Sequence, residues 1–594
     1  MGEKQSAVKE RTRRFFTRTS RKEPDQDDKP AKQERKPSLN DLLDTSCEKY
    51  GGQPAIGMAL DTPLTYNQFG ERVRLIAAAL RRDGVKEQSR VAILAENSHN
   101  WGTAYLAIVR LGAAVVPILP DLPEADVHHI LSEMESEIIF ITQRQIEKLY
   151  EFTAPLKKVI TLDDYVDRNQ LAHAEPFTDY LKAAEAEFRE ELEAGSLEFP
   201  EVDGRSLASI LYTSGTSGFS KAVMLSHYNM YANAHTLGKL IDLPPKSTFL
   251  SVLPISHTYE FTSGFLWPLT EGARIAYVGK TPTPSILKKM CARERPTVMM
   301  VVPLIMEKIY KKRVLAAIDQ SKLLTTVCKF GVGRRFIYRK IGKKLLDFFG
   351  GELMVMGIGG AALNPDVEHF LREAEFPFLV GYGLTESAPL LSGGPFGDTT
   401  ITPCSSGKPV PGVEIRIADA DPRTGIGEIE ARGPNIMQGY WNDAEATAET
   451  LSADGWLSTG DLGMLDDAGN LHIKGRCKSV IVMASGENIY PEAIEHKING
   501  YSFVVESLVI ENNDTLEAWI YPDYELIDEE TRGKTRQQRH QYVADLLGEM
   551  RREVNRQLPK TSRIARVVER REPFIKTATH KIKRYLYTGE SSVK

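Results

Sequence analysis

From residue 39 onward, short runs of apolar residues alternate with longer segments of helical periodicity. Continuous apolar runs bounded by glycine, proline and polar positions are typical of strands that are buried on both faces. Strands that alternate with helices of about ten residues predict parallel sheets covered by helices on both sides. The expected strands are residues 91–94, 115–118, 138–141, 297–302, 353–356 and 378–380, and helices are expected at 101–111 and 125–134.

After residue 407 the pattern changes to shorter strands separated by tight turns. Residues 414–417 and 429–432 alternate between apolar and polar positions, which is typical of strands with one buried face. Residues 466–473 contain a turn followed by a short apolar run and predict a hairpin. Near the end of the chain, residues 542–558 have the period of an amphipathic helix.

The chain is predicted to be an α/β protein with two folded domains and a tail. Residues 39–475 form the large N-terminal domain of βα-layered sheets, which includes a small β-rich subdomain, and residues 476–594 form a small α+β domain. Residues 1–38 lack apolar periodicity, and residues 1–37 hold 12 basic and 7 acidic side chains, as in a disordered tail. The alternative is a tether to a membrane surface, with Phe15 and Phe16 buried and the arginines on anionic lipid.

Composition narrows the function class. Of the 594 residues, 42% are hydrophobic and 26% are charged, as in globular proteins, and the net charge of −5 argues against nucleic-acid binding. The five cysteines form no Cys-x-x-Cys pair, which fits a reducing compartment. No apolar stretch reaches the roughly 18 residues of a transmembrane segment, and no signal peptide is recognisable. We therefore expect a cytoplasmic protein, either free or peripheral on the inner face of a membrane.

The most informative segment is Leu-Tyr-Thr-Ser-Gly-Thr-Ser-Gly-Phe-Ser-Lys, residues 211–221. Glycines allow successive backbone N–H groups to turn toward one point, hydroxyls add donors and the lysine adds a full charge. The segment is therefore predicted to bind phosphate. It does not fit a Walker A loop, because Ser220 precedes Lys221 and Ala222 follows it.

Residues 213–222 resemble the signature of the adenylate-forming (AMP-binding) acyl-CoA synthetases. The segment departs from that signature at Ser217, Ser220 and Ala222, which are all small residues. The resemblance implies that this loop holds ATP, with Lys221 on the β and γ phosphates. The ATP-binding residues that it implies here are Thr213, Ser214, Gly215, Thr216, Ser217, Gly218 and Lys221.

Residues 381–386, Gly-Tyr-Gly-Leu-Thr-Glu, resemble the same family's adenine and magnesium motif. By that likeness Tyr382 stacks on adenine, Thr385 bonds the α-phosphate and Glu386 holds Mg²⁺, roles that suit these residue types. Residues 357–362 also fit the GxGxxA dinucleotide fingerprint, but the acidic residue expected about 20 positions later is missing. The implied adenine pocket comprises Gly360, Ala361, Ala362, Gly381, Tyr382, Gly383, Leu384 and Thr385.

Three later motifs follow in the order in which the family has them. Ser-Thr-Gly-Asp461 resembles the ribose-binding motif, and a carboxylate can accept bonds from both ribose hydroxyls. Gly-Arg476-Cys-Lys478 resembles the segment with a ribose-contacting arginine and the hinge residue. The segment that ends in His580-Lys581-Ile-Lys-Arg resembles the catalytic-lysine motif, with His580 where glycine is usual.

The resemblance implies two half-reactions that use ATP, Mg²⁺ and CoA. A carboxylate first attacks the α-phosphorus of ATP, with Lys581 on the carboxylate and the α-phosphate. The CoA thiolate then attacks the acyl-AMP and releases AMP. For this second step the C-terminal domain rotates about Lys478 and presents Gly486, beside which the pantetheine passes.

The acid is expected to be a medium- or long-chain fatty acid. The resemblance places His257 and Gly383 in the acyl pocket. It implies that His257 lines the passage where the carboxylate meets ATP and that its role is geometric. With this role, His257 is the third expected catalytic residue, beside Lys581 and Thr385. The alternative is a core histidine. Acetate-specific relatives have tryptophan where Gly383 stands, and residues 324–349 resemble an insertion of long-chain members. Two alternatives remain: an acyl carrier protein as acceptor, which suits the net charge of +9 over residues 551–594, and a ligand-binding pseudoenzyme.

Overall fold

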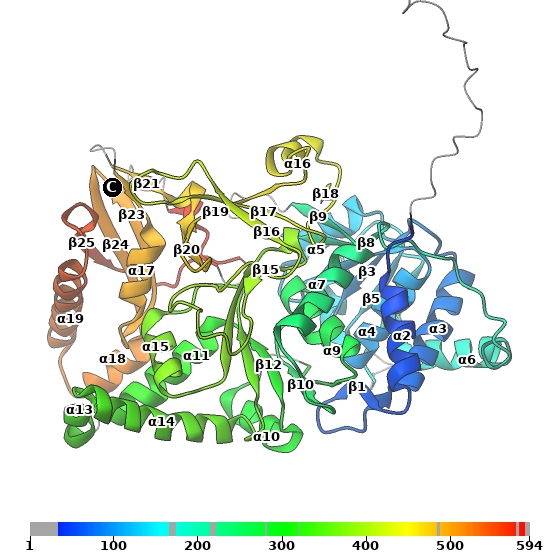
Figure 1. The fold of residues 1–594 in the computed structure, drawn as a ribbon, viewed down its shortest axis with the longest axis horizontal. Coiled ribbons are helices and arrows are strands. Elements are labelled where there is room, and N and C mark those ends of the chain that lie inside the picture. The colour runs from blue at the N-terminus through cyan, green and yellow to red at the C-terminus, as the bar shows by residue number, and fades with distance from the viewer. Residues whose placement is uncertain are drawn as a thin grey trace, which may run out of the picture. The chain divides into compact units, whose positions relative to one another are not determined.

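Two eight-stranded sheets, with helices between and around them, make up most of the chain (Figure 1). The computed structural model describes residues 34–164, 174–213, 221–279, 282–319, 321–483, 487–577 and 581–587. The described residues from 37 onward belong to one compact unit. Residues 1–33 of the expected tail lie outside the described part of the chain, so both interpretations of the tail stay predictions.

The first sheet carries the strands on either side of the expected phosphate loop. Its order is β18-β9-β8-β4-β3-β5-β6-β7, and the pairs from β8 to β7 are parallel, as the βα pattern predicts. β9 and β18 are antiparallel to their neighbours. The strands are β3 (Arg90–Leu94), β4 (Ala114–Ile118), β5 (Ile138–Ile141), β6 (Lys158–Thr161), β7 (Glu175–Pro176), β8 (Leu207–Tyr212), β9 (Ala222–Ser226) and β18 (Gly439–Tyr440).

The second sheet has the order β15-β14-β13-β12-β10-β11-β1-β2. Its inner strands are parallel, with β12 fully buried and β14 half-buried, and only the edge strands β2 and β15 run antiparallel. The carboxyl ends of β12, β13 and β14 therefore meet at one edge, where ligands of open α/β sheets bind. The strands are β1 (Pro54–Met58), β2 (Leu64–Thr65), β10 (Thr248–Ser251), β11 (Arg274–Tyr277), β12 (Val298–Val301), β13 (Val355–Ile358), β14 (Phe378–Gly383) and β15 (Leu390–Gly393).

Helices pack between the two sheets and on their outer faces. Helix α4, which is buried from Asn100 to its end, contacts β3 and β4 of the first sheet and β1 of the second. It begins at His99, two residues before the expected start, because the Ser98 side chain caps it by accepting the N–H of Trp101. The principal helices are α2 (Leu39–Tyr50), α3 (Tyr66–Arg82), α4 (His99–Arg110), α5 (Glu124–Glu133), α6 (Phe177–Glu193), α7 (His227–Leu240), α10 (Pro284–Glu294), α11 (Pro303–Ile309), η4 (Tyr310–Leu315), α12 (Ala316–Asp319), α13 (Lys322–Cys328), α14 (Gly331–Phe348) and α15 (Pro365–Glu373).

The shorter strands after residue 407 form a four-stranded antiparallel sheet of order β16-β17-β19-β20. The expected hairpin at residues 466–473 is confirmed, because its turn joins β19 to β20. This sheet is the predicted β-rich subdomain, and its last strand ends at the expected hinge segment. Its members are β16 (Glu414–Ala418), β17 (Gly427–Arg432), β19 (Leu457–Leu465) and β20 (Leu471–Arg476).

The C-terminal segment has a hydrophobic core of its own. The three-stranded sheet β23-β24-β25 packs with α17 and α19. The expected helix at 542–558 begins earlier, at Arg536, because Thr535 and Gln538 form a capping box. The elements are β21 (Ile481–Val482), β22 (Asn488–Ile489), α17 (Pro491–Asn499), β23 (Val504–Asn512), β24 (Thr515–Pro522), α18 (Tyr524–Glu530), α19 (Arg536–Arg556) and β25 (Ile564–Glu569).

Backbone carbonyls of the C-terminal segment accept hydrogen bonds from the N-terminal body. The Asn364 amide donates to the carbonyl of His496 over 3.2 Å. The Lys311 ammonium donates to the carbonyls of Asn499 and Val504. Within the described ranges, no helix has the length and apolar character to cross a bilayer.

Candidate active site

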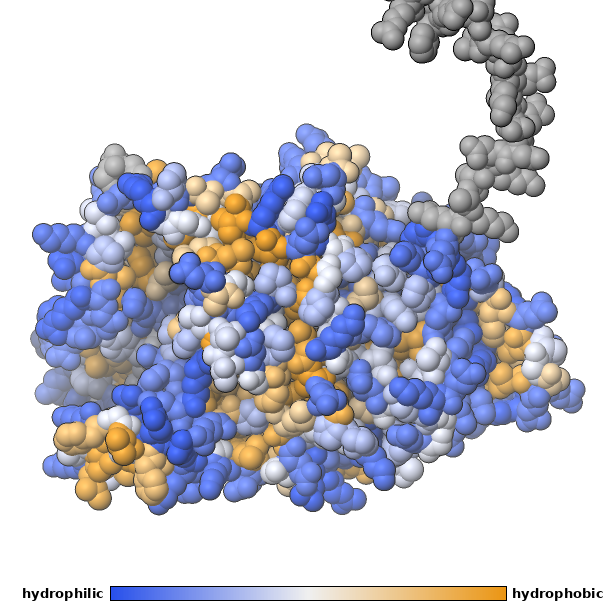
Figure 2. Space-filling model, viewed as in Figure 1, coloured by the Kyte–Doolittle hydropathy of each residue, from blue (hydrophilic) through white to orange (hydrophobic). Residues whose placement is uncertain are grey.

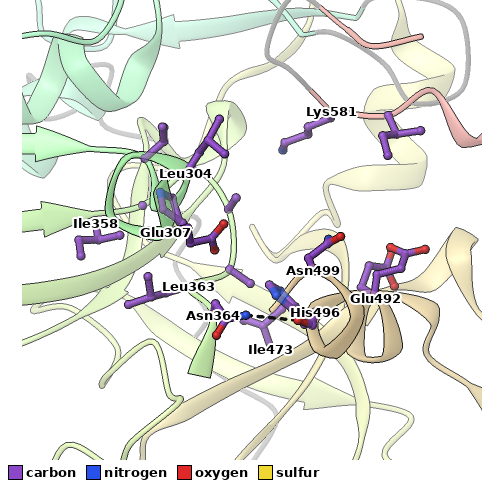
Figure 3. A pocket seen from close by; sticks show the side chains of 18 of the residues that line it. Leu304, Glu307, Ile358, Leu363, Asn364, Ile473, Glu492, His496, Asn499 and Lys581 are labelled. Atoms are coloured by element: carbon purple, nitrogen blue, oxygen red, sulfur yellow. Dashed lines mark hydrogen bonds between the residues drawn. The ribbon is translucent and has the colours of Figure 1, made fainter. Parts of the chain in front are cut away.

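One cavity of about 3600 Å³ brings together segments that lie far apart in the sequence. Its walls come from the end of β8, Lys221 just before β9, the carboxyl ends of β12, β13 and β14, the hairpin β19–β20, and the C-terminal segment. Figure 3 shows part of this pocket, with Lys581 entering from the C-terminal segment. The described residues of the predicted site all line it: Thr213, Lys221, His257, Gly360, Ala361, Ala362, Gly381, Tyr382, Gly383, Leu384, Thr385, Glu386, Asp461, Arg476, Lys478 and Lys581. The predicted site residues Ser214, Gly215, Thr216, Ser217, Gly218 and Gly486 lie outside the described residues.

Asp461, Arg476 and Tyr382 form a bonded cluster on one wall. Asp461 and Arg476 are cross-strand neighbours on β19 and β20, and the Arg476 Nε lies 2.7 Å from the Asp461 Oδ1. The Tyr382 hydroxyl donates to the other carboxylate oxygen over 2.7 Å. Burial raises the pKa of Asp461, against the opposing charge of Arg476. Each carboxylate oxygen keeps a free lone pair, so the cluster can also accept two hydroxyl donors.

Tyr440 connects two predicted phosphate-side residues, and sequence reasoning missed it. Its hydroxyl donates to the Glu386 Oε1 over 3.1 Å, and the Lys221 ammonium lies 4.4 Å from its ring centroid. Tyr440 belongs to β18, which pairs with β9 directly after the phosphate loop. Because this pairing joins segments more than 200 residues apart, no local sequence signal indicated Tyr440.

Glu386 is the predicted metal ligand, and its surroundings limit how a metal can bind. Among the residues that the structure describes, no group of three or more His, Cys, Asp and Glu side chains could hold a metal ion. Mg²⁺, however, keeps several waters and is usually held by one or two carboxylates together with substrate phosphates. A single carboxylate at the cavity wall fits such a shared site.

Lys581 is held in the cavity by a small turn. Its backbone N–H donates to the Thr577 hydroxyl over 3.2 Å, and its carbonyl accepts the Thr577 N–H over 2.8 Å. The side chain is open to solvent within the cavity, yet the walls displace much of the surrounding water. This desolvation and the charge of Arg476 lower the pKa of Lys581, while Asp461 and Glu386 oppose the shift. Lys581 is therefore the cation that faces the Asp461 cluster from the C-terminal side.

His257 caps the short helix α8 (Thr258–Glu260). Its Nδ1 accepts the N–H of Tyr259 over 3.3 Å, which places the proton of the neutral ring on Nε2. Burial and the charge of Lys581 lower the pKa of His257 to about 4. A ring that is neutral at physiological pH suits the predicted geometric role and not that of a proton donor.

Beyond the polar walls, the cavity continues into an apolar region. Side chains from α10, β12, α11 and α14 line it, among them Leu287, Val301, Ile305, Ile309 and Phe348. These side chains belong to a hydrophobic cluster on the outer side of the second sheet or pack against it. The site therefore offers a charged end and an apolar end in one continuous space.

The structure gives a backbone reason for glycine at position 383, separate from its predicted place in the acyl pocket. A Cβ at this position would overlap the backbone carbonyl of Pro389, because Gly383 pairs with Leu390 across the β14–β15 edge. Gly383 borders the cavity, but a larger side chain there would collide with its own sheet before it could shorten an acyl pocket. The glycine is explained by this close backbone approach.

Comparison with known proteins identifies the family. Residues 43–441 match the family described as AMP-binding enzyme. The chain belongs to this family. A long-chain-fatty-acid–CoA ligase of Drosophila melanogaster, heimdall, is 31% identical over 501 residues, which cover 78% of this chain and 72% of that protein. A long-chain-fatty-acid–CoA ligase of Salmonella typhimurium is 29% identical over 498 residues, or 80% and 82% of the two chains.

Solved structures confirm the predicted α/β fold of this AMP-binding enzyme. ATP-bound MatB from Rhodopseudomonas palustris superposes with a TM-score of 0.73 at 24% identity, over 94% of this chain and all of that chain. The sequence resemblance to adenylate-forming enzymes is thereby confirmed for the family and the fold. The roles of individual residues stay predictions.

Proposed function

We propose that this AMP-binding enzyme activates a medium- or long-chain fatty acid as acyl-AMP and transfers the acyl group to CoA. The observation that carries the proposal is the cavity itself, in which Lys221, Glu386, the Asp461–Arg476 pair and Lys581 surround one space that continues into an apolar region. The two relatives named as long-chain-fatty-acid–CoA ligases support this substrate class.

In the first half-reaction a carboxylate attacks the α-phosphorus of ATP, and pyrophosphate leaves. Asp461 accepts the ribose hydroxyls, while Arg476 and Tyr382 hold its carboxylate in place. Lys221 faces the β and γ phosphates, and Lys581 draws the incoming carboxylate to the α-phosphate. At an effective dielectric of 20, a unit charge about 4 Å away contributes roughly 4 kcal/mol. Cations therefore offset the repulsion between two anions.

Glu386 would hold Mg²⁺ together with the phosphates of ATP, and Tyr440 orients its carboxylate. The ion, when bound, supplies positive charge against the charge that develops on the leaving pyrophosphate. His257, neutral and buried, lines the entrance of the carboxylate without exchanging a proton.

In the second half-reaction the CoA thiolate attacks the acyl-AMP carbonyl, and AMP leaves. Lys581 would obstruct that approach, so we propose that the C-terminal domain, residues 476–594, rotates about Lys478 and brings Gly486 to the site. Two hydrogen-bonding side chains, Lys311 and Asn364, link the body to backbone carbonyls of this domain. Contacts of this kind can break and form again without disturbing either hydrophobic core.

The apolar end of the cavity supports a medium- or long-chain acid as the substrate. Each CH₂ group buried there contributes about 0.8 kcal/mol, so affinity should rise from acetate to the longer acids. A thiol-consumption assay with ATP, Mg²⁺, CoA and a series of acids from acetate to stearate tests this. Equal turnover of all acids, or a preference for acetate, would contradict a fatty-acid substrate.

An acyl carrier protein is the alternative acceptor. The net charge of +9 over residues 551–594 suits such an acidic partner. A competition between free CoA and the phosphopantetheinyl form of an acyl carrier protein separates the two acceptors: faster loading of the carrier protein would favour the alternative.

All five cysteines are free thiols, which supports the proposed cytoplasmic location.

A further inference from the structure

An exposed apolar cluster lies on α13 and the first half of α14. Leu323, Phe330, Val332 and Phe336 are 72%, 69%, 88% and 59% exposed. Among the described residues, these are four of the eleven large hydrophobic side chains that are exposed, and they fall within one short stretch of chain. Figure 2 shows the apolar patch at the lower left, where Figure 1 labels α13. Scattered exposed hydrophobics are ordinary, but a contiguous patch indicates an interaction surface.

The fold does not need this cluster for its own stability. α14 buries its opposite face, with Ile337, Tyr338 and Leu345 in the cluster on the outer side of the second sheet. Gly342 permits close packing of the helix against the backbone of Ala374. Val332 and Phe336, one helical turn apart, therefore form a solvent-facing stripe that no described element covers.

Basic side chains surround the apolar cluster. Arg334 and Arg339 are paired with Glu373 and Glu375, and the Lys340 ammonium lies 4.5 Å from the Phe336 ring centroid. Five further cations are exposed on α13, on α14 and in the short link between them: Lys322, Lys329, Arg335, Lys343 and Lys344. In contrast to Arg334 and Arg339, none of these five forms an ion pair with a described acidic side chain.

We propose that the surface of α13 and α14 docks on an anionic lipid bilayer. The four exposed hydrophobic side chains enter the boundary between headgroups and acyl chains, and the unpaired cations contact lipid phosphates. Both contributions are needed, because neither a few apolar side chains nor a few charges hold a protein on a membrane alone.

The charge pattern distinguishes a bilayer from protein partners. A second copy of this chain would place equal positive charges opposite each other, which disfavours a symmetric dimer at this surface. An acidic protein would satisfy the cations, but Phe330 and Val332 need an apolar partner that can receive protruding side chains. A bilayer with anionic lipids supplies both.

Docking at this surface would also bring the apolar end of the cavity near the lipid. Only this consequence, and not the docking itself, rests on the proposed function as a fatty-acid ligase. α12 contacts α13, and Ala316 at its start lines the cavity together with Leu315, the last residue of η4. A fatty acid that partitions into the bilayer would then be close to the space that receives its chain.

The test is sedimentation of the full-length protein with vesicles of phosphatidylcholine, with and without phosphatidylglycerol. One variant combines Phe330→Ser with Phe336→Ser, and its control is Tyr150→Ser, which removes an aromatic ring that is 70% exposed elsewhere. A second variant combines Lys343→Glu with Lys344→Glu, and its control is Lys86→Glu with Lys246→Glu, two exposed lysines outside the cluster. A third combines Phe15→Ser with Phe16→Ser in the tail.

We expect binding that requires phosphatidylglycerol and weakens at high salt. Each variant of the α13–α14 surface should bind about tenfold more weakly or worse, while both controls bind as the wild type does. Thiol consumption with a soluble, short fatty acid should be unchanged in all variants, so that loss of vesicle binding is separable from loss of ligase chemistry.

Several results would overturn the proposal. These are a wild type that does not sediment with anionic vesicles, surface variants that bind normally, and binding that depends only on Phe15 and Phe16. Light scattering that shows a dimer broken by Phe330→Ser with Phe336→Ser would assign the surface to self-association. Loss of affinity for an acyl carrier protein without loss of vesicle binding would assign it to that partner.

Discussion

Replacing Lys581 by methionine removes one positive charge from the cavity and keeps most of the side-chain volume. Lys581 shares this space with Arg476, Asp461 and Glu386. Desolvation in the cavity and the charge of Arg476 lower its pKa, while the two carboxylates oppose the shift. A full charge about 4 Å from the reacting phosphate would be worth roughly 4 kcal/mol at a dielectric of 20. Because the side chain is open to solvent, screening reduces this to about 2–3 kcal/mol, which corresponds to about 10²-fold in the rate of adenylation.

The two half-reactions give separate readouts for this variant. Formation of acyl-AMP from ATP and the acid should fall by about 10²-fold or more, whereas thioester formation from supplied acyl-AMP and CoA should stay near the wild-type rate. Lys583→Met is the matched control, since Lys583 lies two residues away and does not line the cavity. Equal loss of both half-reactions in Lys581→Met, or equal loss of adenylation in both variants, would refute this division of roles.

Three further predictions concern the fold around the site. Burial raises the pKa of Glu260 to about 8, so the folded protein keeps a proton that the unfolded chain releases above pH 4.5. The free energy of unfolding should therefore fall by a few kcal/mol as the pH rises from 4.5 to about 8. Urea titrations of Glu260→Gln should show no such fall with pH, and a fall equal to that of the wild type would contradict the raised pKa. Gly383→Ala should lower the midpoint of thermal unfolding by a few degrees through its clash with the adjacent backbone, while Gly52→Ala, with open space around it, should not; equal midpoints would contradict the clash. Lys311→Met should accelerate hydrogen exchange in α17 by removing the bonds that hold the C-terminal segment, and unchanged exchange would show that these bonds do not hold it.

Local pattern was sufficient to predict most of the expected strands and to pick out motif residues that line one cavity. The apolar run at 91–94 became β3 and is buried on both faces, and the runs at 353–356 and 378–380 became parts of adjacent parallel strands. Most motif residues line one cavity because they follow a strand end or lie on the hairpin β19–β20, whereas Lys581 comes from a turn near the end of the chain. Residue type and spacing carried this information.

Contacts between distant segments could not be predicted in this way. Tyr440 reaches Lys221 and Glu386 only because β18 pairs with β9, and nothing in the local sequence specifies that pairing. The close packing at Gly383 could not be predicted for the same reason, since the neighbour that excludes a side chain is the backbone of the segment leading to β15. The early start of α19 escaped detection because its first turns are polar and only the cap at Thr535 marks them.

Exchange of labelled pyrophosphate into ATP tests the central claim most directly, since it requires reversible formation of an acyl adenylate and nothing else. If Lys221, Lys581 and the Asp461–Arg476 pair surround a bound nucleotide as proposed, exchange should depend on a fatty acid and Mg²⁺, and Lys581→Met should reduce it by about 10²-fold. If no acid from acetate to stearate promotes exchange in the wild-type protein, the cavity is not an adenylation site, and the chain binds its ligands without activating them.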